Sequence, residues 1–193
     1  RFQKSHGAIV SGYRAQISVD AKEQVIVACD VTRDAADTKQ LEPMLEQTFE
    51  NTQKPIEDTT IVTADSGYSS MENLGKLEQS EHTIDAYIPD AKYQAKQRDK
   101  QIDEDSPFHK NKFSYKPIDD TYLCPDNRRL EFAYNSIDDK GNRFSYYHCK
   151  SCQNCKHFGR CTKSPKGRGI RIYDNEHLIY NMRQKLDTKQ GKQ

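Results

Sequence analysis

One short segment of the sequence combines a predicted buried strand with a single carboxylate at its end. The β-branched run Thr59-Thr60-Ile61-Val62-Thr63-Ala64 is typical of a β-strand, and Asp65-Ser66-Gly67 follows at once. Gly67 frees the backbone to turn, and the serine pair at 69–70 can cap the next helix. Open α/β sheets place reactive groups at the carboxyl ends of strands, so Asp65 is a candidate ligand for a hard cation such as Mg²⁺. The alternative is that Asp65 only forms the turn or caps the helix.

Apolar periodicity on both sides of this segment predicts further strands and helices. The expected elements are, in order, strands over 13–19 and 25–31, a helix after Asp37, the strand 59–64, a helix near 70–80, a strand over 83–88 and a helix over 175–186. Pro43 predicts an irregular start for the first helix. This order favours an α/β fold with a mixed sheet flanked by helices, and it resembles part of a ribonuclease H-like core.

The character of the sequence changes after residue 90 and predicts four regions. These are a partial ribonuclease H-like core over 1–90, a polar linker or insertion over 91–120, a basic cysteine-rich insertion over 121–170, and a helix over 171–193 that leads back to the core. Residues 121–170 show little apolar periodicity. We therefore expect a small zinc-knuckle-like fold there, in which metal binding replaces a hydrophobic core.

Charge is unevenly distributed along the chain. The formal net charge is only +1, but residues 1–90 carry 8 Lys and Arg against 16 Asp and Glu, whereas residues 91–170 carry 17 against 10. Residues 140–173 contain 9 basic residues and no acid. Such a basic stretch suits contact with nucleic-acid phosphates, and a solvated surface is the alternative. The candidate DNA-binding residues are Lys150, Lys156, Arg160, Lys163, Lys166 and Arg168.

Five of the six cysteines are clustered with spacings that suit a metal site. Cys124, Cys152, Cys155 and Cys161 are the predicted ligands of a structural Zn²⁺, because thiolates two residues apart can bind one tetrahedral ion. Cys149, His148 and His157 are possible substitutes. An iron–sulfur cluster, unligated thiols and a disulfide framework are the alternatives, although nothing suggests secretion. Cys29 lies within a predicted strand and is expected to be a small buried apolar residue.

Four motifs occur together in order along nearly the whole chain. They are Gly12-Tyr13-x-x-Gln16-x-x-Val19-Asp20, Ala64-Asp65-x-Gly67-Tyr68, Tyr122-x-Cys124-Pro125 and Cys152-x-x-Cys155-x5-Cys161-Thr162. This combination resembles the DDE transposases of bacterial insertion sequences, in the branch that carries a cysteine-rich insertion before the last catalytic helix.

The resemblance implies a ribonuclease H-like fold in which three carboxylates and two Mg²⁺ ions promote in-line attack on a DNA phosphodiester. Asp65 matches the second of the three acids. The first acid and the glutamate find no match, so the resemblance implies an internal fragment of the catalytic domain that is inactive alone. It also implies transposon-end and target DNA as partners, and a homo-oligomer in the full-length protein.

Two other functions suit the same residues. One is a non-catalytic, zinc-stabilised module that binds nucleic acid, including a remnant of a decayed element, and the other is a small α/β domain in a protein–protein role. No apolar run approaches the ~20 residues that a membrane helix needs, and no signal peptide opens the chain, so we expect a cytoplasmic protein without membrane contact.

Overall fold

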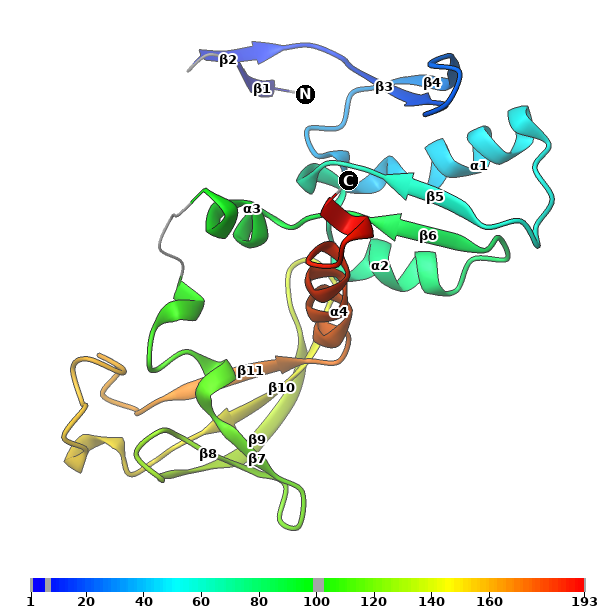
Figure 1. Ribbon diagram of the computed structural model, residues 1–193. Helices are drawn as coiled ribbons and strands as arrows, with labels where there is room; N and C mark the ends of the chain where they lie inside the picture. Colours follow the sequence, from blue (N-terminus) through cyan, green and yellow to red (C-terminus); the bar gives the residue numbers. More distant parts are fainter. Residues whose placement is uncertain (1, 6–7, 99–102, 193) are drawn as a thin grey trace. The chain divides into compact units, whose positions relative to one another are not determined.

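The computed structural model describes residues 2–5, 8–98 and 103–192, and Figure 1 shows their arrangement into elements. Mixed α/β structure is observed, as the sequence predicted, with four α-helices and a curled antiparallel sheet. The strands are β1 (Phe2–Ser5), β2 (Ala8–Ser11), β3 (Arg14–Val19), β4 (Ile26–Thr32), β5 (Thr60–Thr63), β6 (Ile84–Tyr87), β7 (Ser114–Lys116), β8 (Thr121–Leu123), β9 (Arg129–Ile137), β10 (Arg143–His148) and β11 (Gly169–Tyr173). The α-helices are α1 (Leu41–Thr52), α2 (Met71–Glu78), α3 (Ala91–Gln97) and α4 (Glu176–Leu186).

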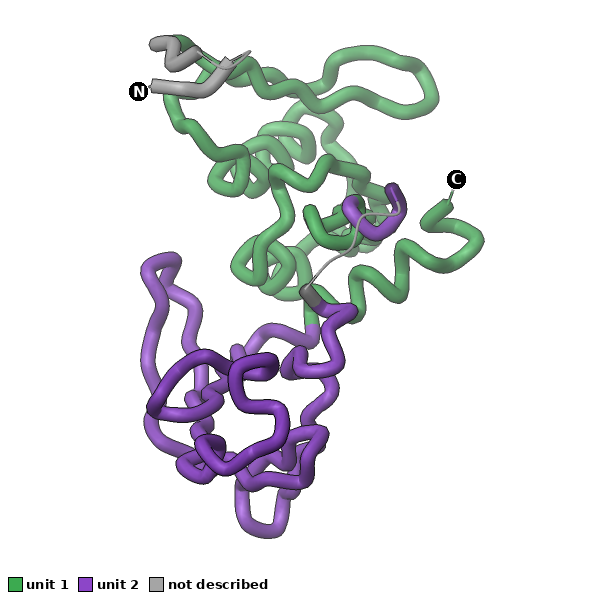
Figure 2. The backbone as a smooth tube through the Cα atoms, turned by 90° about the vertical axis from the view of Figure 1, so that its left-hand side faces the viewer, with its two compact units in different colours: residues 1–94, 178–193 green, residues 95–177 purple. Residues whose placement is uncertain are grey.

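The chain divides into two compact units, which Figure 2 shows in different colours. Unit 1 comprises residues 1–94 and 178–193, and unit 2 comprises residues 95–177. Unit 2 is therefore inserted into the sequence of unit 1.

The strands and helices that apolar periodicity predicted for unit 1 are present, whereas β1, β2 and α3 were not predicted. Strands β3 and β4 form the expected antiparallel hairpin, and β5 pairs with β6 in parallel. Helix α1 begins at Leu41 after the short 3-10 helix η1 (Asp37–Lys39), which is the irregular start that Pro43 predicted. Because Leu41, Met44 and Phe49 are buried, α1 presents one apolar face to the core.

The predicted mixed sheet is divided in the described part of the chain. Strands β3–β4 form one two-stranded sheet and β5–β6 another. Side chains connect the hairpin to the rest of unit 1; for example, the Asn51 amide on α1 donates a hydrogen bond of 2.7 Å to the Val27 carbonyl on β4. The face of β3 that looks into unit 1 carries the buried Gln16, whereas Ile17 is 59% exposed. Side-chain contacts, including those of the buried Ala28 on β4, therefore hold the hairpin in place, since it does not pair with β5–β6 in the described residues.

Helix α4 completes the core of unit 1 beside the end of β6. Leu41, Ala86 and Ile88 form the buried cluster, and Met182 packs against it. The Ile88 amide donates to the Met182 sulfur at 3.4 Å. The core of unit 1 is thus assembled from residues on both sides of the insertion.

Unit 2 contains a hydrophobic core of its own, so the expectation that metal must replace one there is wrong. Its five-stranded antiparallel sheet has the order β11-β10-β9-β8-β7. The buried cluster formed by the sheet and its adjoining loops consists of Phe113, Leu130, Tyr147, Cys149, Cys152 and Ile170. Their periodicity is weak in the sequence because the strands are short and a bulge between Tyr146 and Tyr147 interrupts the alternation.

No helix in residues 2–5, 8–98 and 103–192 is long and apolar enough to cross a membrane.

An ion pair between Asp90 and Arg183 joins the end of β6 to α4. Arg183 Nε lies 2.5 Å from Asp90 Oδ2, and Nη2 lies 3.1 Å from Oδ1. Burial alone would raise the pKa of Asp90, but the Arg183 guanidinium and the amides of Tyr93 and Lys92 bring this pKa below its usual range. The charged carboxylate is therefore favoured by the folded state.

We predict that Asp90→Asn lowers the free energy of unfolding by about 2–3 kcal/mol at pH 7, because it leaves a half-buried guanidinium without its counter-charge. The pair stabilises the fold above the usual Asp pKa of about 4, and this contribution is lost as pH falls through the lowered folded-state value. Urea unfolding at pH 7 and at about pH 3 should show that the difference between native protein and variant shrinks in acid. Glu57→Gln, at an exposed site, is the control. An equal destabilisation at both pH values would contradict this account.

Candidate functional site

Asp65 lies at the carboxyl end of β5, as predicted, and its side chain is exposed. It precedes the 3-10 helix η2 (Ser66–Tyr68), and one of its carboxylate oxygens accepts a hydrogen bond of 2.7 Å from the Gly67 amide. Ser70 then caps α2 by accepting from the Asn73 amide at 3.0 Å. Asp65 therefore caps the turn, and the same exposed carboxylate is placed where a ligand can reach it.

A buried polar network ties this turn to the hairpin. Gln16 on β3 is only 4% exposed, and its side-chain oxygen accepts a hydrogen bond from the Tyr68 hydroxyl. The Gln16 amide nitrogen donates to Asp37 Oδ1 at 2.8 Å, and Arg14 donates to Asp37 Oδ2 at 2.7 Å. Burial alone would raise the pKa of Asp37, but the hydrogen bonds from Arg14 and Gln16 and the charge of Arg14 lower it overall. Asp37 is thus a stable carboxylate beside the turn.

Asn73 holds the same turn from the side of α2. Its side chain is 4% exposed, and its amide nitrogen donates at 2.7 Å to the carbonyl of Thr38 in η1 and at 2.7 Å to the carbonyl of Tyr68 in η2. An amide buried without partners would cost about 1–3 kcal/mol, so this doubly bonded arrangement favours a single position for the two short helices. Gln16 and Asn73 together leave the Asp65 turn little freedom.

Gly67 separates two carboxylates. A Cβ atom built on Gly67 would lie 2.9 Å from Asp37 Oδ2 and 2.9 Å from Asp65 Oδ1. Burial has the largest effect in raising the pKa of the Tyr68 phenol, and the charges of Asp37 and Asp65 raise it further, so Tyr68 interacts with both acids. Asp37 therefore lies next to Asp65 in space although 28 positions separate them in the sequence.

An exposed carboxylate such as Asp65 fits the preference of Mg²⁺ for oxygen ligands. In the described residues, however, no group of three or more His, Cys, Asp or Glu side chains is arranged to hold a metal ion. The part of the chain that the structure describes thus offers one ligand of the predicted magnesium site, and not a complete site.

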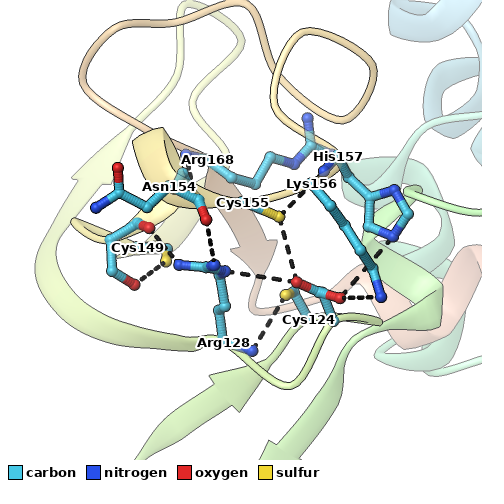
Figure 3. A network of polar contacts seen from close by, with 11 residues as sticks. Cys124, Arg128, Cys149, Asn154, Cys155, Lys156, His157 and Arg168 are labelled. Carbon is cyan, nitrogen blue, oxygen red and sulfur yellow. Dashed lines mark hydrogen bonds and ion pairs between the residues drawn. The ribbon is translucent and has the colours of Figure 1, made fainter.

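The second candidate site is a pocket in unit 2. Figure 3 shows the polar contacts around Cys124, Cys149 and Cys155 there. All five clustered cysteines line a small cavity of about 20 Å³, together with His157 and Asp126. The four predicted zinc ligands therefore line one cavity, but neither they nor any other three His, Cys, Asp or Glu side chains of the described residues are arranged to hold a metal ion. Cys124 follows β8, Cys149 follows β10, and Cys152 begins the 3-10 helix η5 (Cys152–Asn154).

Backbone amides point at the sulfurs of three predicted ligands. Cys124 accepts from the Arg128 amide at 3.3 Å, Cys155 from the His157 amide at 3.4 Å, and Cys152 from the Arg168 amide at 3.3 Å. Such amides stabilise a thiolate, which is the form that binds metal. The fifth sulfur is that of Cys149, which is 1% exposed and contacts the Ser151 hydroxyl at 3.4 Å. Cys149 belongs to the core of unit 2, as Cys152 also does.

Burial raises the pKa of Cys152 to about 11, and burial likewise raises the pKa of Cys161. These thiols are therefore protonated at neutral pH.

The predicted DNA-binding residues fall into two groups. Lys150, Lys156, Arg160, Lys163 and Lys166 are exposed. Arg168 is partly buried and donates to the carbonyls of Phe108 at 3.1 Å and Cys161 at 3.5 Å, so its contacts hold the cysteine loop. The exposed lysines and Arg160 are thus better placed than Arg168 to contact a polyanion.

Asp37 and Asn73 were not predicted from the sequence, and Gln16 was noted only within a motif. One signal was present for Gln16, namely a polar residue at the centre of an alternating strand. No local signal marks Asp37 or Asn73, because their partners are 21 or more positions away or lie in backbone carbonyls of another turn.

A family model described as the transposase DDE domain matches residues 1–185. No curated protein and no solved structure matches the sequence.

Proposed function

The chain belongs to the family of transposases with a DDE domain, and on this premise we propose that it forms part of the machinery that cuts and joins DNA, with Asp65 as a metal ligand. The family implies DNA binding and transposition, and its members use a divalent metal. The observation that carries the assignment to Asp65 is its exposed carboxylate at the end of β5, on a turn held by Gln16 and Asn73.

When bound, a divalent cation in such a site neutralises charge on the phosphodiester and lowers the pKa of the attacking hydroxyl or water. Asp65 would orient that cation, and the rigid turn would keep the carboxylate in place during the reaction. Because one carboxylate cannot hold two ions, and the other two acids of the motif find no match in this sequence, we propose that this chain does not cut DNA by itself. A homo-oligomer that brings two DNA ends together is part of the same proposal.

We predict that Asp65→Asn, in the complete element, lowers transposition by about a hundredfold or more and leaves DNA affinity unchanged, since it removes a metal ligand and not a phosphate contact. The purified chain should leave supercoiled DNA with element ends intact in Mg²⁺ or Mn²⁺. Normal transposition by Asp65→Asn would reject the metal role. Cleavage by the purified chain that disappears in Asp65→Ala would instead support that role and contradict the proposed inactivity.

We also propose that unit 2 is the cysteine-rich insertion of the branch found in bacterial insertion sequences, and that its pocket binds one Zn²⁺ through Cys124, Cys152, Cys155 and Cys161. The convergence of these residues on one cavity and the amides directed at three of the sulfurs support this choice. Cys149 would remain a core residue. Zinc would then add to the stability of a unit that already has an apolar core.

Elemental analysis of the purified chain should find about one zinc per chain, and a chelator should lower the melting temperature. Cys155→Ser should lose the metal, whereas Cys29→Ser is the matched control that should keep it. Cys29 lies in unit 1 and is exposed, so the expectation that it is buried is wrong. Stoichiometric iron would favour a cluster instead, and a metal-free protein indifferent to chelators would refute the proposal.

A non-catalytic nucleic-acid module is the second candidate function, and the exposed basic side chains around the cysteine loop favour it. The two functions share one requirement, which is that these side chains contact phosphates.

Charge reversal at Lys163 and Lys166 should weaken DNA binding about tenfold at 0.1 M salt and reduce the salt slope by about 2, because two phosphate contacts are lost. The double variant Lys22→Glu/Lys189→Glu changes net charge equally at exposed sites in unit 1 and is the control. Fluorescence anisotropy with labelled duplex measures both quantities. Equal losses in the two variants would mean that net charge, and not this loop, governs binding.

A further inference from the structure

Asp37 is a carboxylate whose side chain is fixed from two directions. Its two oxygens accept from Gln16 at 2.8 Å and from Arg14 at 2.7 Å, and both donors lie on β3. The backbone around it is fixed as well, since the adjacent Thr38 carbonyl accepts from the buried Asn73 amide. Asp37 therefore has a defined position in unit 1.

That position is directly against the Asp65 turn. The space over Gly67 is bounded on one side by Asp37 and on the other by Asp65, each with an oxygen 2.9 Å from where a Cβ atom would stand. Gln16 binds Asp37 through its nitrogen and Tyr68 through its oxygen, so it links the two. Movement of Asp37 would therefore be transmitted to Gly67 and Tyr68 in η2.

We propose that Asp37 is a positioning residue for Asp65, which fixes the Asp65–Tyr68 turn through Gln16 and adds negative potential where Asp65 meets a divalent cation. This inference rests on the proposed metal role of Asp65. Asp37 itself is occupied by Arg14 and Gln16, so it acts through its charge and its contacts and not as a ligand. Glycine at position 67 contributes to this arrangement, because a methyl group there would displace the carboxylate of Asp37 or that of Asp65.

A Tb³⁺ titration of the whole chain tests the effect on the cation. Tyrosine-sensitised Tb³⁺ emission reports the binding, and the component that Asp65→Asn abolishes is assigned to this site. We expect Asp37→Asn to weaken Tb³⁺ binding about three- to tenfold, because it keeps the shape of the side chain and removes its charge. Asp58→Asn, at an exposed loop site, should have no effect.

A second measurement needs no metal. In protein labelled with ¹³C at the tyrosine ring, the pKa of Tyr68 should fall in Asp37→Asn, since the carboxylate that raises it is gone, and should be unchanged in Asp58→Asn. Gly67→Ala leaves both charges and the bonds of Asp37 to Arg14 and Gln16 available, but it crowds the carboxylates. We expect Gly67→Ala to weaken Tb³⁺ binding as well, and this variant replaces Asp37→Asn in the test if Asp37→Asn does not fold.

The outcomes separate this inference from the proposed function. If Asp37→Asn, or Gly67→Ala in its place, matches Asp58→Asn in both measurements, the positioning role is refuted. If Asp65→Asn leaves all of the tyrosine-sensitised Tb³⁺ binding intact, the metal role of Asp65 fails, and the Tyr68 pKa alone then decides whether Asp37 controls the turn.

Discussion

The ion pair between Asp90 and Arg183 holds together the two parts of an interrupted unit. These residues are 93 positions apart, and all of unit 2 lies between them in the sequence. An insertion is compatible with a folded host only if the chain leaves and re-enters at neighbouring points. Asp90 meets this need with one side chain, because it accepts from Arg183 and also from the amides of Lys92 and Tyr93 at the start of α3. The core of β6 and α4 then closes beside this point.

The Asp65 turn shows how buried amides can make an exposed group rigid. Gln16 and Asn73 are each almost fully buried, and their side-chain groups are hydrogen-bonded to neighbouring elements. A buried amide that loses its partners is costly, so such residues strongly favour one geometry. The carboxylate of Asp65 itself stays exposed, as the proposed role of a cation ligand requires. The buried amides thus fix the turn, while the Asp65 carboxylate remains accessible to solvent.

Unit 2 joins an apolar core and a thiol pocket at one end of a sheet. Cys149 and Cys152 belong to the buried cluster and also line the pocket. The amides that point at the sulfurs come from residues in the loops around it, including the basic segment that follows Cys155. Order in the pocket and order in the exposed basic loop are therefore coupled, which would make a bound metal ion relevant to DNA contact as well as to stability.

The sequence by itself determined the local features of this protein. The β-branched run before Asp65, the apolar faces of α1 and α2, and the spacing of the cysteines are short-range patterns, and each predicted element of unit 1 is present. The family could be inferred for the same reason, since its motifs are short and ordered. The tertiary structure decided what depends on contacts between distant segments. The separation of β3–β4 from β5–β6, the core of unit 2 and the placement of Asp37 against Asp65 involve partners that no local pattern connects. Apolar periodicity indicates which residues are buried, but only the folded chain shows which polar groups form hydrogen bonds with one another.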